Sequence, residues 1–298
     1  MPELPEVQTT VNGLNKKVLN RAFIDVWTDW AKIVKKPANF KNFKKEIKGK
    51  RIIKIWRRAK NIIFNLSDGC SLLIHQKMTG HLLVEKWKRI NGKWIPTKKG
   101  FMQDPYNSYI HLMFQLSDDL MLALSDVRKF AKVELWRTDE LLNSKEFKTL
   151  GPEPLEKTFT FKKFEEALRQ KSSLPKLRQG KVKQVLIDPY VIAGIGNIYS
   201  SEALWHAKIH PEKSVAKLTN KELKSLYQSI KKVLQLGVNL GGESFSDYRK
   251  PDGSKGNFDA ERKVYKREGQ KCQRCKTKIK RIKVAQRSAF FCPKCQKL

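Results

Sequence analysis

The first half of the chain alternates short apolar runs with turn signals. At its start, Val7, Val11, Leu14 and Val18 recur at helical spacing, which predicts an amphipathic helix over residues 5–20. The apolar runs that follow have the length and flanking residues of strands, at 51–55, 62–66, 71–75, 81–84, 110–116, 120–124 and 132–136. Asp68-Gly69 and the Ser-Asp-Asp stretch at 117–119 predict hairpin turns. This half therefore predicts a β-sandwich or barrel with a leading helix.

The pattern changes after the Gly-Pro-Glu-Pro stretch at 151–154. Residues 161–171 have helical spacing. Thr219 and Glu222 form a capping box ahead of a periodic apolar run, and Gly237 predicts the stop of that helix. The second half is therefore expected to be helical, with a Gly-rich polar stretch at 237–259 leading to a cysteine segment.

Length and composition limit the class of protein. The 298 residues suffice for about two domains, and 40% hydrophobic content supports a packed core. No run of about 18 apolar residues occurs, and the opening MPELPEV has neither a basic leader nor an apolar segment. The expectation is a cytosolic protein without a signal peptide.

Charge points to a polyanionic partner. The chain has 62 Lys and Arg against 29 Asp and Glu, a net charge of +33. Nucleic acid is the leading candidate partner, because neutralised phosphates release counterions and so drive binding. A lysine-rich genome is the alternative explanation. Between residues 35 and 60 the cations alternate with apolar residues, which favours a folded basic face over a disordered tail.

Four of the five cysteines form two Cys-x-x-Cys pairs, Cys272/Cys275 and Cys292/Cys295, separated by sixteen residues. Each pair forms a tight turn, or knuckle, that directs two thiolates to one point. Two such knuckles can together form a tetrahedral four-sulfur site around one structural Zn²⁺. Two disulfides are the alternative, and a cytosolic location disfavours them. The residues between the knuckles are sufficient for a β-hairpin, whose cations suit DNA. Cys70 is expected to be a small core residue.

Seven short motifs, in order, carry a resemblance. They are PELPEV at 2–7, RRAK at 57–60, HQKMTG at 75–80, DVRKF at 126–130, LGPEPL at 150–155, AGIGNIY at 193–199, and AQR at 285–287 inside the predicted ribbon. In this order and spacing the chain resembles the formamidopyrimidine-DNA glycosylase family, which also contains endonuclease VIII. The resemblance covers the chain from its first residue to its last.

The resemblance implies a two-domain α+β fold. Residues 1–150 are expected to form an N-terminal β-sandwich flanked by helices. Residues 151–260 would form a helix-two-turn-helix domain with a lesion-capping loop at 241–259, and residues 261–298 the zinc ribbon. Double-stranded DNA that contains oxidised bases or abasic sites would bind in the cleft between the domains, and a monomer is expected.

The resemblance also implies a mechanism. Removal of Met1 exposes the secondary amine of Pro2, which attacks C1′ of the damaged nucleotide, expels the base and forms an iminium with the opened sugar. β-Elimination and then δ-elimination cut the strand. Glu3 is expected to move protons on the sugar, and Lys60 to contact phosphate near the lesion and assist catalysis.

Seven further residues are expected, by resemblance, to contact DNA. Met78, Arg128 and Phe130 match the side chains that fill the void left by a flipped base. The residues expected to contact a phosphate are His75, Lys183, Asn197 and Arg287. Asn197 follows the turns of Gly194 and Gly196 and begins a helix, whose N-terminus suits an anion.

Two other functions remain open at this stage. An enzyme of the endonuclease VIII branch would prefer oxidised pyrimidines, but Leu4 and the Met78/Arg128/Phe130 set favour the purine branch. A non-catalytic zinc-ribbon protein that binds damaged DNA is the second, but intact Pro2 argues against it, as do Glu3 and Lys60. The sequence departs from the family at three positions, with Gln8 for Glu, Val127 for Pro and Ala131 for Gly.

Overall fold

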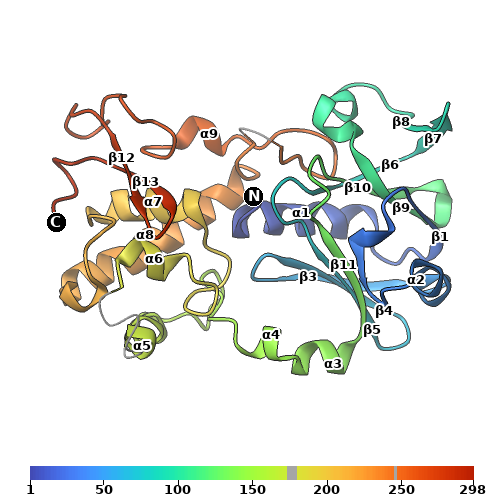
Figure 1. Cartoon of the computed structure of the whole chain (residues 1–298), viewed down its shortest axis with the longest axis horizontal. Coiled ribbons are helices and arrows are strands. Elements are labelled where there is room, and N and C mark those ends of the chain that lie inside the picture. Colours follow the sequence, from blue (N-terminus) through green and yellow to red (C-terminus); the bar gives the residue numbers. More distant parts are fainter. Residues whose placement is uncertain (173–179, 245–246) are drawn as a thin grey trace. The chain divides into compact units, whose positions relative to one another are not determined.

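The computed structural model describes residues 1–172, 180–244 and 247–298 (Figure 1). The chain forms two compact units. The first contains Met1–Lys148 and Leu240–Asp259, and the second contains Thr149–Asn239 and Ala260–Leu298. The boundary expected from the sequence at residue 260 assigns residues 240–259 to the helical domain, whereas in space they pack with the N-terminal unit.

The N-terminal unit is a β-sandwich. Its four-stranded sheet has the order β1 (Phe23–Thr28), β9 (Ile110–Leu116), β10 (Met121–Ser125), β6 (His81–Glu85). The five-stranded sheet has the order β2 (Val34–Lys36), β11 (Lys132–Arg137), β5 (Cys70–His75), β4 (Asn61–Leu66), β3 (Ile52–Arg58). Neighbouring strands are antiparallel except β2 and β11. All seven strands expected from the apolar runs are confirmed, as are the turns at 68–69 and 117–119.

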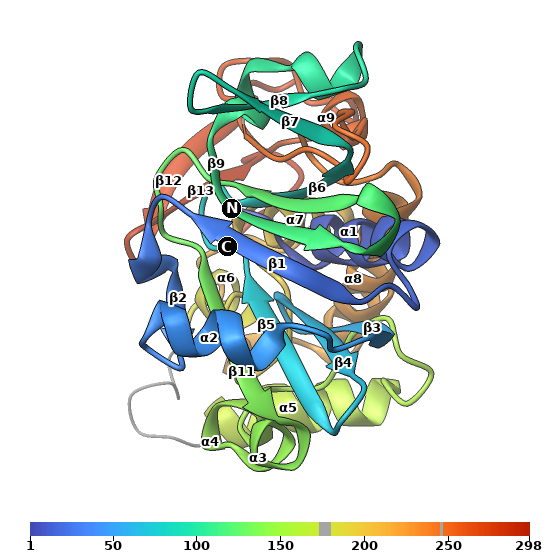
Figure 2. The same cartoon turned by 90° about the vertical axis from the view of Figure 1, so that its right-hand side faces the viewer.

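The sequences of the strands are continuous apolar runs, because each sheet is covered on both faces and residues on both sides of a strand are buried. Leu82 and Val84 of β6 point into the core between the sheets, whereas Leu83 packs on the other face. There it meets Trp87 of the hairpin β7 (Trp87–Ile90) and β8 (Lys93–Pro96), and Met102 of η2 (Phe101–Gln103). Figure 2 shows this hairpin outside the four-stranded sheet.

The five-stranded sheet is covered in the same way. Its outward residues Ile63 and Leu73 pack with Leu141 and Phe147, which belong to α3 (Thr138–Asn143) and α4 (Lys145–Lys148). Cys70 lies in the core, as expected. Neither outer layer was predicted from the sequence, because these short segments carry too few apolar residues to show a period of their own.

The predicted first helix is α1 (Leu4–Lys17), and its buried stripe packs against β3, β4 and β6. Because the helix begins at Leu4, Pro2 and Glu3 lie at its N-terminus. A second helix, α2 (Phe40–Ile47), was not predicted; it packs against β1 and β2 through Phe43 and Ile47 (Figure 2). Its Asn39 side chain caps the first turn by accepting from the Asn42 N–H.

The second unit is helical, with a terminal hairpin. Its elements are α5 (Phe161–Ser172), α6 (Val182–Leu186), α7 (Asn197–Ala207), α8 (Asn220–Asn239) and the ribbon strands β12 (Lys280–Val284) and β13 (Arg287–Phe291), while the short α9 (Phe258–Glu261) spans the boundary between the units. The predicted capping box is present: the Thr219 hydroxyl accepts from the Glu222 N–H at 3.2 Å, and Glu222 accepts from the Thr219 N–H at 2.9 Å.

The predicted stop at Gly237 was wrong. Gly237 is buried inside α8, which continues to Asn239. Gly241 and Gly242, with φ of 76° and 84°, supply the left-handed residues that follow the helix. Among the described residues, no helix is long and apolar enough to cross a membrane.

Candidate active site and zinc centre

The start of α1 is a buried polar corner. Pro2 is buried and Glu3 is 2% exposed. The Glu3 N–H donates to Glu6 Oε2 at 2.7 Å, and the Glu243 N–H donates to Glu6 Oε1, also at 2.7 Å. Each oxygen of the buried Glu6 carboxylate therefore accepts a backbone donor, and this side chain joins the N-terminus to the 240–259 loop. The sequence left Glu6 without a function.

The amine of Met1 lies in the same corner. Burial lowers the pKa of this amine below its usual value, and the nearby charge of Lys60 lowers it further. Glu3, Glu6 and Asp247 oppose the shift. The net direction favours the neutral amine, which is the nucleophilic form.

A cavity of about 380 Å³ adjoins the N-terminus. Its lining residues are Met1, Lys35, Lys77, Met78, Lys129 and Phe130. The structure thus brings Met78 and Phe130, which are far apart in sequence, to one hollow beside the chain terminus. Three lysines at its rim give it a positive potential that suits an anionic ligand.

Lys60 lies in the two-residue turn between β3 and β4, where Ala59 takes a left-handed conformation with φ of 52°. Arg57 fixes this turn by donating to Ala59 O at 2.8 Å and to Gln8 Oε1 at 3.0 Å. Gln8, the departure from the family's Glu, therefore keeps an acceptor for this arginine.

His75 ends β5 near Lys60, Lys77 and Lys132. Burial and these lysines lower the pKa of His75 to about 3, so its ring is neutral near pH 7. Because Nδ1 accepts the Lys77 N–H at 2.9 Å, the ring proton lies on Nε2, where it can serve as a donor to phosphate.

Asp126, which the sequence analysis did not single out, organises the loop that carries Arg128 and Phe130. It is fully buried and accepts from the Thr79 hydroxyl and the Ala131 N–H, the latter at 2.8 Å. The Arg128 N–H contacts both Asp126 Oδ1, at 3.2 Å, and the Thr79 hydroxyl, at 3.1 Å. Asp126 thus joins the turn at residues 77–79, hereafter the Met78 turn, to the loop at residues 126–131, hereafter the Arg128 loop. An Asp that directly follows an apolar strand is the sequence signal that could have found it.

Arg128 and Phe130 are both exposed, and the Arg128 guanidinium lies 4.6 Å from the Phe130 ring centroid. Lys129 between them has a φ of 57°, so the loop makes a tight turn at this point. The stacked pair presents a planar cation and an aromatic ring together, which is a suitable arrangement for contacts with nucleobases.

In the second unit, Asn197 begins α7 as expected. Lys183 was expected to contact a phosphate, and the structure places it beneath the surface. Its side chain is fully buried, and Nζ donates to Asn197 O at 2.8 Å, Ser200 Oγ at 2.8 Å and Ser201 Oγ at 2.6 Å. Lys183 therefore holds the first turn of α7 from beneath and adds positive potential there.

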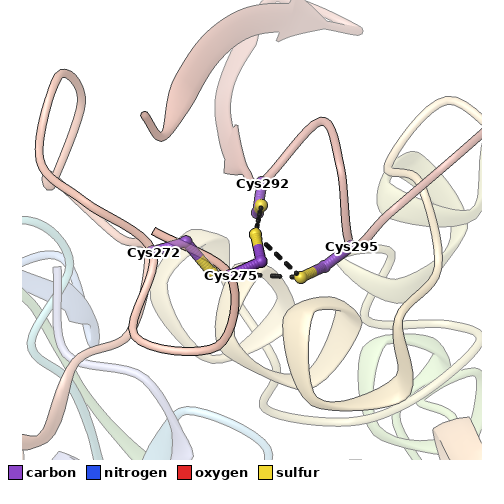
Figure 3. Close-up of side chains that lie close together, drawn as sticks. All are labelled: Cys272, Cys275, Cys292 and Cys295. Atoms are coloured by element: carbon purple, nitrogen blue, oxygen red, sulfur yellow. Dashed lines mark hydrogen bonds between the residues drawn. The ribbon is translucent and has the colours of Figure 1, made fainter. Parts of the chain in front are cut away.

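The four ribbon cysteines converge (Figure 3). Their sulfur atoms lie within 4.8 Å of one another, with Cys275 at 3.4 Å from both Cys292 and Cys295. Sulfurs bound at about 2.3 Å around a tetrahedral Zn²⁺ lie about 3.8 Å apart, so the cluster fits that ion. Four thiolates leave no open position for water, and the site is therefore structural.

The zinc ribbon is docked on α7. Arg274, inside the first knuckle, lies 3.7 Å from the Trp205 ring centroid and donates to Trp205 O at 2.8 Å. The fully buried Glu202 accepts the backbone N–H groups of residues 263–265 at 2.8–3.0 Å. Arg287 is exposed and follows the β12–β13 turn, where it can reach a phosphate.

Comparison with known proteins agrees with this arrangement. Family models match residues 1–133 (formamidopyrimidine-DNA glycosylase N-terminal domain), 150–249 (formamidopyrimidine-DNA glycosylase H2TH domain) and 269–298 (zinc finger found in FPG and IleRS). The formamidopyrimidine-DNA glycosylase of Pelotomaculum thermopropionicum is 37% identical over 298 residues, which cover all of both chains. The chain belongs to the formamidopyrimidine-DNA glycosylase family. The formamidopyrimidine-DNA glycosylase of Chloroflexus aggregans is 38% identical to this chain, over 100% of this chain and 99% of its own length.

Solved structures of the family match the whole chain. Lactococcus lactis Fpg in complex with abasic-site DNA is 36% identical, with a TM-score of 0.83 over 99% of this chain and all of that one. A MutM complex with DNA containing carbocyclic 8-oxo-G has the same identity and TM-score, with full coverage of both chains. These matches confirm the α+β fold with an H2TH domain and a zinc ribbon.

Proposed function

We propose that this protein is a bifunctional DNA glycosylase and abasic-site lyase of base excision repair that acts on oxidised purines, 8-oxoguanine and formamidopyrimidines. The observation that carries the proposal is the buried N-terminus of α1, where Pro2 lies beside Glu3 and the charge of Lys60 acts on the terminal amine. The lowered pKa is that of the Met1 amine, and we infer that the Pro2 amine, which becomes the terminus in the same buried corner when Met1 is removed, is favoured in its neutral form for the same reason.

The chemistry follows from the secondary amine that Pro2 presents once Met1 is removed. Its lone pair forms a bond to C1′ as the glycosidic C–N bond breaks, and the base leaves with that electron pair and a proton. The sugar ring opens to give an iminium. Loss of a C2′ proton then expels the 3′ phosphate, and a second elimination expels the 5′ phosphate. Glu3 is the neighbouring carboxylate that can carry these protons.

The purine preference rests on Met78, Arg128 and Phe130. Met78 and Phe130 line one cavity beside the N-terminus, and Arg128 stacks on Phe130. We propose that Met78 occupies the space of the flipped base, that Arg128 hydrogen-bonds the orphaned cytosine, and that Phe130 wedges beside it. Residues 245–246 of the expected lesion-capping loop lie outside the described residues.

Phosphate contacts are assigned to His75, Asn197 and Arg287, with Lys183 supporting Asn197 from below. Lys60, in its turn near the N-terminus, would contact a phosphate close to the lesion. Double-stranded DNA is the partner, the protein acts as a monomer, and nucleoid association would follow from DNA binding.

Borohydride trapping on a duplex with 8-oxoguanine opposite cytosine tests the function. Wild-type protein with Met1 confirmed absent is compared with Pro2→Gly and Glu3→Gln, and with a duplex containing an oxidised pyrimidine. The expected result is a covalent protein–DNA band on the purine lesion that Pro2→Gly diminishes. A band mainly on the pyrimidine lesion would move the protein to the endonuclease VIII branch. No band on either lesion would make it a protein that only binds damage.

A further inference from the structure

Residues 104–109, hereafter the 104–109 segment, contain η3 (Pro105–Ser108) and belong to none of the family motifs. The segment contacts the end of β10, just before the Arg128 loop. The Ser125 hydroxyl donates to Tyr106 O at 2.7 Å, and the Asp126 N–H donates to Tyr109 O at 2.9 Å. One side of the segment therefore fixes the strand end from which Arg128 and Phe130 project.

The same segment contacts the start of β6, just after the Met78 turn. His81 is fully buried, and its Nε2 forms a hydrogen bond of 3.0 Å with Asn107 Oδ1. Burial lowers the pKa of His81 to about 4, so the neutral ring donates through Nε2. Asn107 thereby holds the residue that lies three positions after Met78.

The third contact of the segment is with the 240–259 loop. Asn107 Nδ2 donates to Gly253 O at 3.2 Å. Arg249 is 2% exposed, and its Nη2 donates to Asp104 Oδ1 at 3.0 Å while its Nε lies 3.0 Å from Oδ2. Its guanidinium also lies 4.9 Å from the Tyr106 ring centroid.

Electrostatics and sterics indicate that this contact is tight. Burial alone would raise the pKa of Asp104, but hydrogen bonds from Arg249 and from the Tyr106 N–H bring it below its usual value. A Cβ on Gly253, whose φ is 81°, would lie 2.9 Å from Phe101 O. The segment and this part of the loop are therefore in close contact with little room for another side chain.

The loop is held at two ends. Its first part is tied to Glu6 by the Glu243 N–H, and its later part is tied by Arg249 and by Pro251 O, which accepts the Val84 N–H at 2.8 Å.

We propose that the 104–109 segment positions residues 249–253 relative to the Met78 turn and the Arg128 loop, with Asp104 and Arg249 as positioning residues for base excision. This inference rests on the proposed function. Arg249 approaches both oxygens of Asp104, one through a hydrogen bond from Nη2 and the other through the ion-pair contact of Nε, so the contact constrains orientation as well as distance. The loop that would cover a flipped base and the two segments that would fill the space it leaves in the duplex thus share one support.

Single-turnover kinetics on two substrates test the proposal. The first substrate carries 8-oxoguanine, whose base the loop would cover, and the second carries a preformed abasic site, which has no base to cover. We expect Arg249→Met and Asp104→Asn each to slow excision of 8-oxoguanine by about tenfold or more, because small misplacements near a reacting group are costly. Strand cutting at the abasic site should change by less than about threefold, since it bypasses base recognition.

Two further variants separate positioning from folding. Ile47→Ala removes a fully buried side chain of α2, away from the three segments, and should lower thermal stability without changing the ratio of the two rates. Arg249→Lys, which keeps the charge but not the paired geometry, should fall between wild type and Arg249→Met.

Equal loss of both rates in Arg249→Met, or no loss in either, would overturn the proposal. If wild type itself fails to excise 8-oxoguanine, the proposed function fails instead, so the two failures can be told apart.

Discussion

At the scale of single residues, the site depends on buried carboxylates whose oxygens each accept a different donor. Glu6 joins the Glu3 and Glu243 N–H groups, and Asp126 joins Thr79, Arg128 and Ala131. None of these contacts involves the proposed nucleophile itself. Because a buried donor without an acceptor costs free energy, such carboxylates hold turns in place that have little apolar surface of their own.

Replacing Glu6 by Gln should therefore damage the site without changing its shape. One side-chain oxygen becomes an NH₂ group that faces a backbone donor, so one N–H loses its acceptor. We expect a loss of about 1–3 kcal/mol in the free energy of unfolding and slower base excision, measured by denaturant titration and single-turnover kinetics. Glu46→Gln, the same change at an exposed position on α2, should alter neither, and equal effects of both variants would refute the role given to Glu6.

The terminal amine should make activity depend on Lys60 in a pH-specific way. The charge of Lys60 lowers the pKa of the Met1 amine. We expect it to act in the same direction on the Pro2 amine that takes its place, and only the neutral form of that amine can attack. In Lys60→Met the pKa of the terminal amine should rise. The acidic limb of the pH profile of the borohydride-trapping rate should therefore move to higher pH. Lys54→Met, an exposed cation on β3, is the control. A rate loss in Lys60→Met with an unmoved limb would leave Lys60 only a phosphate contact.

At the scale of elements, the zinc ribbon has little core to hold it without metal. Its two short strands share a small apolar cluster with Trp205, Val264 and the cysteines themselves. A segment this small gains most of its folding free energy from the ion.

Removal of zinc should therefore weaken DNA binding. With a strong chelator, the β12–β13 hairpin is expected to lose its structure, and the affinity for an abasic-site duplex should fall severalfold as Arg287 loses its position. Added Zn²⁺ should restore binding. Fluorescence anisotropy before and after chelation measures this, with metal-replete Arg287→Ala as the comparison; unchanged affinity in metal-free protein would contradict the role of the ribbon.

At the scale of the whole molecule, the net charge of +33 makes association with DNA dependent on salt. Each phosphate contact contributes about 0.9 to the slope of log affinity against log salt. Arg287→Ala should lower that slope by about one, whereas Lys41→Ala on α2 should leave it unchanged. The slope comes from anisotropy titrations at several salt concentrations. Equal changes in both variants would mean that the charge acts diffusely rather than through an assigned contact.

Prediction from the sequence succeeded where the signal is local. Apolar runs predicted seven strands, the Thr219/Glu222 box predicted the start of α8, and Cys-x-x-Cys spacing predicted the metal site. It failed at Gly237, because helix packing overrides the intrinsic preference of a single glycine. It also missed β1, whose apolar run is interrupted by Asp25, and it missed β2, α2 and the β7–β8 hairpin, where apolar residues are mixed with cations.

The sequence by itself determined seven of the strands, the first helix, the zinc ligands and the family to which the chain belongs, because periodicity, turn chemistry and ligand spacing are properties of neighbouring residues. Tertiary structure alone decided that residues 240–259 pack on α1, that Lys183 is buried beneath α7, and that Asp104 meets Arg249. Those contacts join residues separated by many positions in the chain, and their free energy comes from desolvation and hydrogen-bond geometry that exist only once the chain has folded.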